Sequence, residues 1–163
     1  MELARAAGVN TAPCRLVPID QVDRIAEELL GHGNQALAVD RFDRNAGDGR
    51  LHIEDAAQIL GALGERKYTM GTTETVLNMI RRFSTDWRAD VLIGNGDNHL
   101  KNWSFIFPEP GETRLSPAYD IVPTVLYIPH DSLALRFAGT HKFENVGMMR
   151  MRRVAQFLGL DPD

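Results

Sequence analysis

Three oxygen-bearing side chains carry the strongest chemical signal in this sequence. Asp97 stands in a glycine-containing stretch, Asn102 follows 5 positions later, and Asp120 comes a further 18 positions along the chain. Transfer of a phosphoryl group needs a carboxylate to receive the proton of the acceptor hydroxyl, and oxygen ligands that hold Mg²⁺ against the phosphates. Asp97 suits the first role, and Asn102 with Asp120 suits the second.

These residues also have a structural interpretation. Asp97, next to Gly96, is by itself more typical of a turn residue that caps its own backbone, because glycine gives a tight loop the conformational freedom it needs. Together with Asn102 and Asp120, however, the stretch favours phosphoryl transfer. That interpretation has one geometric requirement: Asp120 must return to the loop, and a hairpin expected over residues 103–116 would bring it there.

Two further residues of the same loop have weaker signals. His99 could support the loop or contact a phosphate group, and a single histidine is as often structural as functional. Lys101 could neutralise phosphate charge near the transition state. The alternative for Lys101 is an ordinary solvated lysine on the surface.

A second candidate region lies around Phe42, in the charged run from Asp40 to Arg44. It follows an apolar stretch, residues 35–39, that we expect to be a buried strand. Such a crossing from strand to loop can present backbone N–H and C=O groups to the edge of an adenine. A charged surface turn anchored by Phe42 is the alternative. Gln58, on the following helix, could face a ribose, but its spacing gives only weak support.

Apolar periodicity predicts the elements that position these residues. Strands are expected over residues 14–19, 35–39, 103–107, 113–116 and 133–137. Helices are expected over residues 1–8, 20–30 with Asp20 as the N-cap, 52–64, 72–83, 87–93 and 144–158. Their inward faces should carry Ala56, Ile59, Leu60 and Leu63 in one helix, and Val76, Leu77, Ile80 and Phe83 in another. A small strand layer followed mainly by helices with an inserted hairpin is an α+β fold.

The bulk composition is that of an ordinary globular domain. The chain has 163 residues, of which 44% are hydrophobic and 25% charged, and this argues against disorder. A net charge of −4 gives no reason to expect direct binding of nucleic acid. No apolar run approaches the roughly 20 residues of a membrane span. Cys14 is the single cysteine, which suits a reducing cytosol, so we expect a cytoplasmic protein without a membrane anchor.

The sequence lacks the motifs of other common types of catalytic and metal site. The sequence has no Cys or His cluster with zinc spacing and no Gly-x-Ser-x-Gly stretch for a serine nucleophile. A basic cluster near the C-terminus is more typical of a solvated helix face than of a contact with an acidic partner or nucleic acid. Its members are His141, Lys142, Arg150, Arg152 and Arg153.

The patterns at both ends of the sequence indicate that the chain is a piece of a larger protein. Residues 1–8 have the pattern of the last turns of a helix, with Gly8 as the stop, and residues 157–163 have that of a helix exit. A short domain with frayed termini is the alternative.

Taken together, the residues resemble the HipA-like serine/threonine kinase family, in its C-terminal kinase region. The resemblance covers nearly the whole chain and rests on residues 38–44, 52–61, 67–68, 92–104 and 115–123. The pattern Gly-Asp-x-His-x-x-Asn at residues 96–102 is also similar to the catalytic loop of phosphoinositide kinases. The combination of these runs is highly specific.

The resemblance implies a function and a set of roles. It implies Asp97 as the catalytic base and Asn102 with Asp120 as metal ligands, with ATP and Mg²⁺ as cofactors and a protein Ser or Thr as acceptor. It implies an adenine hinge at residues 40–42. The residues implied in nucleotide binding are Asp40, Phe42, Gln58, His99, Lys101 and Tyr119. If the family role carries over, the chain belongs to the toxin of a toxin–antitoxin pair and is partnered by a DNA-binding antitoxin.

The sequence also departs from the family pattern. Family members carry a phosphate-covering loop and a lysine that pairs with the phosphates, whereas no glycine-rich loop precedes residue 14 here and no lysine precedes Lys67. We therefore expect residues 1–44 to be a remnant of the small lobe and hinge, and residues 45–163 to be an incomplete C-lobe. The chain alone should be weakly active or inactive. A non-catalytic interaction module and a small-molecule phosphotransferase are the alternatives.

Overall fold

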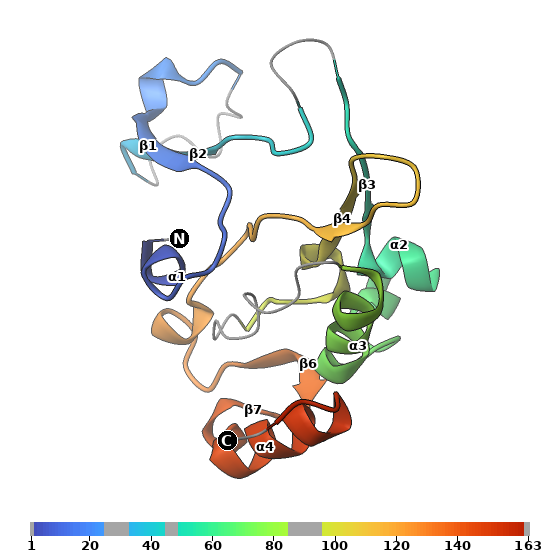
Figure 1. Ribbon diagram of the computed structural model, residues 1–163. Coiled ribbons are helices and arrows are strands. Elements are labelled where there is room, and N and C mark those ends of the chain that lie inside the picture. The colour runs from blue at the N-terminus through green and yellow to red at the C-terminus, as the bar shows by residue number, and fades with distance from the viewer. Residues whose placement is uncertain (1, 25–32, 45–48, 85–95, 162–163) are drawn as a thin grey trace.

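The computed structural model describes residues 2–24, 33–44, 49–84 and 96–161 (Figure 1). The elements, in chain order, are α1 Glu2–Ala6, β1 Cys14–Pro18, β2 Gln35–Val39, β3 His52–Asp55, α2 Ala56–Leu60, α3 Thr73–Phe83, β4 Ser104–Phe107, β5 Arg114–Leu115, β6 Ser132–Phe137, β7 Thr140–Lys142 and α4 Met148–Phe157. This mixture of short helices and small sheets confirms the predicted α+β class. Within the described ranges, no helix has the length and apolar character needed to cross a membrane.

Three small antiparallel sheets are distributed along the molecule (Figure 1). The β1–β2 pair lies at one end, the β3–β4–β5 sheet lies beside α2 and α3, and the β6–β7 pair lies with α4 at the other end. In the middle sheet, Ile53 is opposite Ile106 and Phe105 is opposite Leu115. The predicted hairpin of residues 103–116 is therefore present, with β3 added to its outer edge.

The hydrophobic core lies between α2, α3, β4, β6 and α4. Val76, Leu100 and Phe105 are each 0% exposed. The helix α3 begins at the predicted place because the Thr72 side chain accepts the N–H of Thr75, and the Thr75 side chain in turn accepts the N–H of Thr72. Leu100 belongs to a short 3₁₀ turn, Leu100–Asn102, so its buried side chain anchors this turn in the core.

The β1–β2 sheet lies apart from this core. Residues 35–39 form a strand as predicted, but the expectation that the strand is buried is wrong. Leu37 is 58% exposed and Val39 is 40% exposed. Leu16 lies opposite Leu37 in the register and is 62% exposed. An isolated two-stranded sheet can bury one face at most, and the described residues leave the face with these side chains open.

The start and end of α2 differ from the prediction. His52–Asp55 pairs with β4 and forms β3, so it is not the first turn of a helix. The helix begins after Asp55, whose side chain is the N-cap. It ends early because Gly61, with φ 67°, supplies a left-handed C-cap. Leu63 therefore lies beyond the helix and is 81% exposed, where we expected it to face inward.

Other helix boundaries also differ from those that the sequence predicts. The helix expected to begin at Asp20 does not begin there, because Ile19–Gln21 form one 3₁₀ turn and Val22 is extended. Residues 25–30 and the helix expected over 87–93 lie outside the described residues. At the helix ends, Ile59 and Phe83 are 37% and 50% exposed, so neither is a core residue.

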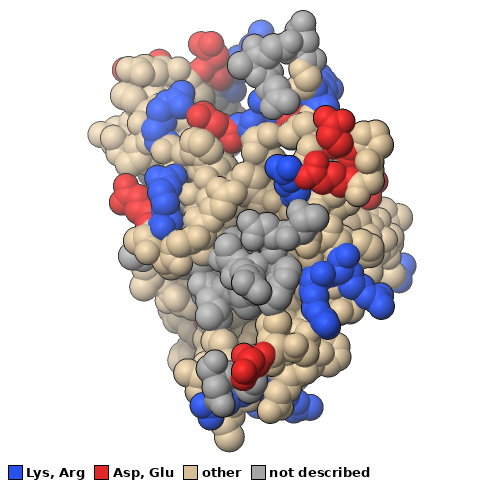
Figure 2. All heavy atoms as spheres, viewed as in Figure 1, with Lys and Arg blue, Asp and Glu red and all other residues tan. Residues whose placement is uncertain are grey.

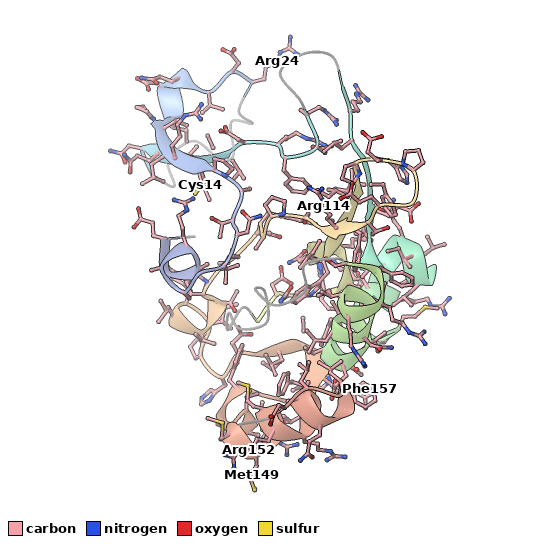
Figure 3. The ribbon with its side chains drawn as sticks, in the orientation of Figure 1. Cys14, Arg24, Arg114, Met149, Arg152 and Phe157 are labelled. Atoms are coloured by element: carbon pink, nitrogen blue, oxygen red, sulfur yellow. The ribbon has the colours of Figure 1, made fainter. Side chains whose placement is uncertain are left out.

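Charged side chains of both signs are interspersed on the face shown in Figure 2, as the small net charge suggests. The predicted basic cluster includes Arg152, on α4. Figure 3 shows Arg152 projecting from α4 at the end of the molecule opposite the β1–β2 sheet, together with the exposed Met149. Its position agrees with the interpretation as a solvated helix face.

A polar contact ties α3 and α4 to the turn between β6 and β7. Ala138 has φ 45° and Gly139 has φ 83° in this turn. The Ala138 N–H donates to Glu74 Oε1 at 2.7 Å, and Arg150 donates to the Ala138 carbonyl oxygen. Glu74 Oε2 is buried and makes no hydrogen bond within the described part of the chain. The turn is thus fixed from both helices through its backbone.

This contact predicts a measurable contribution to stability. Glu74→Ala should lower the free energy of unfolding by about 1–2 kcal/mol, because the buried Ala138 N–H loses its acceptor. Glu74→Gln keeps one acceptor oxygen and should recover most of that loss. Urea unfolding measures both, with the exposed Glu109→Ala as the control. Equal losses for the Ala and Gln variants would contradict the assigned role.

Candidate active site

The loop that carries Asp97 is closed by hydrogen bonds to its own backbone. The Asp97 carbonyl oxygen accepts the His99 N–H at 2.9 Å and the Asn102 side-chain Nδ2–H at 2.9 Å. The Asn102 N–H donates to the His99 carbonyl at 3.0 Å. Because Leu100 is fully buried in the core, the loop is anchored from within. The Asp97 side chain itself is exposed, as a group that meets a substrate must be.

A glycine is needed at position 96 because there is no room for a side chain, and not because the backbone needs a positive φ. We expected a glycine conformation that other residues resist, but Gly96 is not among the residues with positive φ. Instead, a Cβ atom at Gly96 would lie 2.1 Å from Asp131 Oδ2 and 2.5 Å from Thr124 Oγ1. Any larger residue would push these groups away from the loop. Gly94, the other glycine of the stretch, lies outside the described residues.

Tyr119 holds the returning chain against the loop. Its hydroxyl donates to the Lys101 carbonyl oxygen at 2.7 Å and lies 2.6 Å from Ser104 Oγ. Burial raises the pKa of Tyr119 above its usual value, although the Ser104 hydrogen bond opposes this; the nearby charges of Asp55 and Asp120 raise the pKa further. The phenol therefore stays neutral and remains a donor. Because its hydroxyl is engaged, only its ring is available to a nucleotide.

A second contact places the two segments side by side. Thr124 Oγ1 accepts the Gly96 N–H at 2.9 Å, while Tyr119 contacts Lys101 at the other end. These two contacts join residues 119–124 to residues 96–101. Asp97 and Asp120 lie on these facing segments, and Asn102 follows directly. The structure thus brings the three residues that the sequence singled out into one region of the surface.

Asp120 has an unusual backbone. Its φ is 55°, in the left-handed region that non-glycine residues seldom occupy. Its side chain is exposed. Strained conformations of this kind concentrate at functional sites, where the surrounding structure holds them in place.

The donor atoms suit a hard cation. The Asn102 amide nitrogen is committed to the Asp97 carbonyl, which leaves the amide oxygen of Asn102 as the possible ligand. A neutral amide oxygen with the Asp120 carboxylate is a set that Mg²⁺ accepts when phosphate oxygens and water complete its shell. In the described ranges, no group of three or more His, Cys, Asp or Glu could hold a metal ion without such help.

An apolar cavity adjoins Asp120. It has a volume of about 250 Å³ and is lined by Leu37, Val39, Tyr119, Asp120, Ile121 and Val122. One wall is therefore strand β2, and the other is the returning chain. The ring of Phe42 packs against Tyr119, with the two ring centroids 5.6 Å apart.

The segment at Asp40 is held by charges. Asp40 Oδ1 pairs with Arg15 Nη1 at 3.2 Å, and the Asp40 N–H donates to the Pro13 carbonyl at 2.8 Å. Asp43 is only 4% exposed and accepts hydrogen bonds from Arg41 Nε at 2.8 Å and Arg41 Nη2 at 2.6 Å. Arg44 Nη1 adds a third at 2.6 Å. The sequence analysis did not single out Asp43, which fixes the shape of the predicted hinge.

The remaining predicted residues have clear structural contacts. Gln58 Oε1 accepts the Asp55 N–H at 2.8 Å in the capping box of α2, so its contact with a ribose stays a prediction. His99 is 8% exposed and packs edge to face on Tyr68, with ring centroids 5.2 Å apart. This favours the structural interpretation of His99. Lys101 is exposed, as either of its two interpretations requires.

Tyr68 was also missed as a site residue. Its hydroxyl lies 3.5 Å from Asp97 Oδ1, at the limit of a hydrogen bond. The resemblance included residues 67–68, but nothing in their types indicated which side chain Tyr68 would contact. Thr124 and Asp131, which enclose Gly96, were missed in the same way.

The Tyr119 contacts predict a loss of stability on removal of one oxygen. Tyr119→Phe should lower the free energy of unfolding by about 1 kcal/mol, because the Lys101 carbonyl and Ser104 lose their partner while the ring packing is kept. Tyr127→Phe is the matched control, since Tyr127 is 75% exposed. Urea unfolding of both variants gives the comparison, and equal stabilities would contradict the prediction.

Asp43 predicts a loss of stability in acid. The Arg41 hydrogen bond lowers the pKa of Asp43 below its usual 3.8, despite burial, and the charges of Arg41 and Arg44 lower it further. The unfolded chain then binds a proton more readily than the folded chain. The stabilisation is complete above the ordinary pKa and is lost as pH falls through the folded one. Thermal melts from about pH 6 to about pH 3 should show this decline. Asp43→Asn should flatten it, whereas the exposed Asp20→Asn should leave it unchanged.

Comparisons with known proteins identify the family and the relatives of this chain. A family model described as the HipA-like C-terminal domain matches residues 1–162. A Sinorhizobium fredii protein named "Putative kinase Y4dM" is 40% identical over 87% of this chain and 37% of its own length. The "Serine/threonine-protein kinase toxin HipA" of Shewanella oneidensis is 30% identical over 78% of this chain and 33% of its length.

A solved structure shows the same fold. It is the HipA, HipB and operator DNA complex of Shewanella oneidensis MR-1, matched with a TM-score of 0.76 and 24% identity over 99% of this chain and 42% of that chain. The chain thus spans roughly a third of the length of these curated relatives. With the family model matching almost every residue, the chain belongs to the HipA-like C-terminal domain family.

Proposed function

We propose that this chain carries the catalytic and metal-binding part of a serine/threonine protein kinase that uses ATP and Mg²⁺. The observation that supports this most is the pair of hydrogen bonds that joins the loop of Asp97 and Asn102 to the segment of Asp120. The kinase names of the relatives support it independently.

Each residue has a role in this proposal. Asp97 accepts the proton of the acceptor hydroxyl, and the loop hydrogen bonds hold its backbone while its carboxylate stays exposed. The Asn102 amide oxygen and the Asp120 carboxylate hold Mg²⁺, and the bound ion neutralises charge on the phosphates. Lys101, with its exposed side chain, adds positive charge beside the same loop.

The cavity between β2 and the returning chain is the proposed place for the adenine. Its walls are mostly apolar, which suits a flat heterocycle, and its Asp120 edge leads toward the metal ligands. Residues 40–42 then form the hinge, with Asp40 and Phe42 beside the base. In this scheme residues 1–44 are the small-lobe and hinge part, and residues 45–163 are the C-lobe part. The ring of Tyr119 lines the proposed nucleotide site. Gln58 and His99 support the site from the α2 cap and from beneath the loop.

The whole-protein role is a further part of the proposal. The acceptor is a protein Ser or Thr, and the kinase acts as the toxin of a toxin–antitoxin pair. A DNA-binding antitoxin is the proposed partner because the solved relative is a complex of HipA with HipB and operator DNA. A non-catalytic interaction module is the second candidate, because Gln58 and His99, which the resemblance places at the nucleotide, are engaged in contacts within the protein.

The role of Asp97 predicts a selective loss of catalysis. Asp97→Asn should slow transfer of the γ-phosphoryl group from ATP by at least about 100-fold, since the general base is lost while side-chain shape is kept. Radiolabelled ATP with casein as a generic protein acceptor measures the rate. Asp20→Asn, which changes an exposed carboxyl group outside the site, is the control. Full activity of the Asp97→Asn variant would refute the assignment.

Binding of ATP separates the kinase from the interaction module. A ligand that binds only the native state raises the melting temperature, so Mg²⁺ with ATP should stabilise the chain more than ATP alone. Asp120→Asn should abolish the Mg²⁺-dependent part of this shift. Melting curves that respond to neither ATP nor Mg²⁺ with ATP would point to the module.

A further inference from the structure

A hydrogen bond joins the residue before Asp97 to the segment after Asp120. The Gly96 N–H donates to Thr124 Oγ1 at 2.9 Å, and the two residues are 28 positions apart. Gly96 is the chain neighbour of Asp97, and Thr124 is four positions from Asp120. This bond therefore joins the backbone next to the proposed base to a side chain on the segment that follows the proposed metal ligand.

The Thr124 hydroxyl is carried by a well-fixed backbone. Thr124 begins a 3₁₀ turn, Thr124–Leu126, and its N–H donates to the Val122 carbonyl at 2.8 Å. Its own carbonyl accepts the N–H groups of Tyr127 and Ile128, each at 2.9 Å. The hydroxyl is thus presented by a turn with three backbone hydrogen bonds rather than by a free loop.

Close packing leaves Gly96 little room to move away from this hydroxyl. Gly96 is buried, and a Cβ atom there would lie 2.5 Å from Thr124 Oγ1 and 2.1 Å from Asp131 Oδ2. Asp131 is itself fixed, because its Oδ1 accepts the Ser132 N–H at 2.8 Å. Its Oδ2 is buried and has no hydrogen-bond partner in the part of the chain that the structure describes. Asp131 and Thr124 together enclose Gly96.

We propose that Thr124 is a positioning residue for Asp97. By holding the Gly96 amide, its hydroxyl fixes the direction in which the Asp97 carboxylate leaves the loop. The same bond sets the spacing between Asp97 and the segment of Asp120. The inference rests on the proposed role of Asp97 as base. Thr124 acts only through Gly96, and a small displacement of a reacting group is enough to slow a reaction strongly.

The first test separates positioning from binding. Thr124→Val keeps the shape but removes the acceptor, and it should lower kcat for phosphoryl transfer roughly tenfold while the KM for ATP changes by less than about twofold. Thr124→Ser keeps the hydroxyl and should restore kcat. Thr113→Val, in the turn between β4 and β5, is the matched control. A KM effect without a kcat effect, or no rescue by Ser, would overturn the inference.

A double-mutant cycle asks whether Thr124 acts through Asp97. If it does, Thr124→Val should cause no further loss in a chain that already carries Asp97→Asn. Two fully additive losses would show that Thr124 acts elsewhere. Circular dichroism checks that each variant is folded, and Thr124→Ala replaces Thr124→Val if the latter is not.

A measurement without catalysis keeps the two proposals distinguishable. In NMR spectra of the labelled chain, Thr124→Val should speed hydrogen exchange of the Gly96 amide and shift the carboxyl carbon of Asp97, whereas Thr124→Ser should do neither. If the chain shows these changes but neither binds ATP with Mg²⁺ nor transfers phosphate, the kinase proposal fails, whereas the positioning of the Asp97 side chain by Thr124 is supported. Unchanged Gly96 exchange and an unchanged Asp97 resonance in Thr124→Val would overturn the inference, whatever the activity.

Discussion

The candidate site depends on the contact between the Tyr119 hydroxyl and the Lys101 carbonyl oxygen. Burial keeps the phenol neutral, so it stays a donor to this backbone acceptor. The hairpin of β4 and β5 only returns the chain to the neighbourhood of the loop. Tyr119 fixes the returning chain against the loop of Asp97, and its ring also packs against Phe42. The proposed hinge, the loop of Asp97 and the segment of the proposed metal ligand thus share one aromatic residue.

The elements that the sequence predicted well are those whose determinants are local. The helix α3 has its cap at Thr72 and a regular apolar stripe, and the β4–β5 hairpin has an alternating first strand followed by a Pro-Gly turn. His52–Asp55 was misassigned because its strand partner, β4, lies about 50 positions away and gives no local signal. The exposure of Leu37 has a similar cause, since burial depends on what covers a strand and not on its own residues.

The residues of the candidate site also fall into those that the sequence predicts and those that it does not. Asp97, Asn102 and Asp120 are residue types with a chemical reason to stand at their spacing, and the structure places them in one region. Thr124 and Tyr68 are ordinary residue types, and each acts through a contact with a residue 28 or 29 positions away. Such contacts leave no pattern in a single sequence, so the supporting residues could be found only from the fold.

The left-handed backbone conformation of Asp120 limits which residues can replace it in related sequences. Asparagine and glycine tolerate that conformation as well as or better than aspartate does, so replacing Asp120 by either adds no backbone strain. Removing the carboxylate therefore needs only one substitution that the backbone accepts. Under the proposed role of Asp120, a relative that has lost the metal ligand but kept this backbone lies one substitution away, whereas a β-branched residue at the same position would strain the backbone.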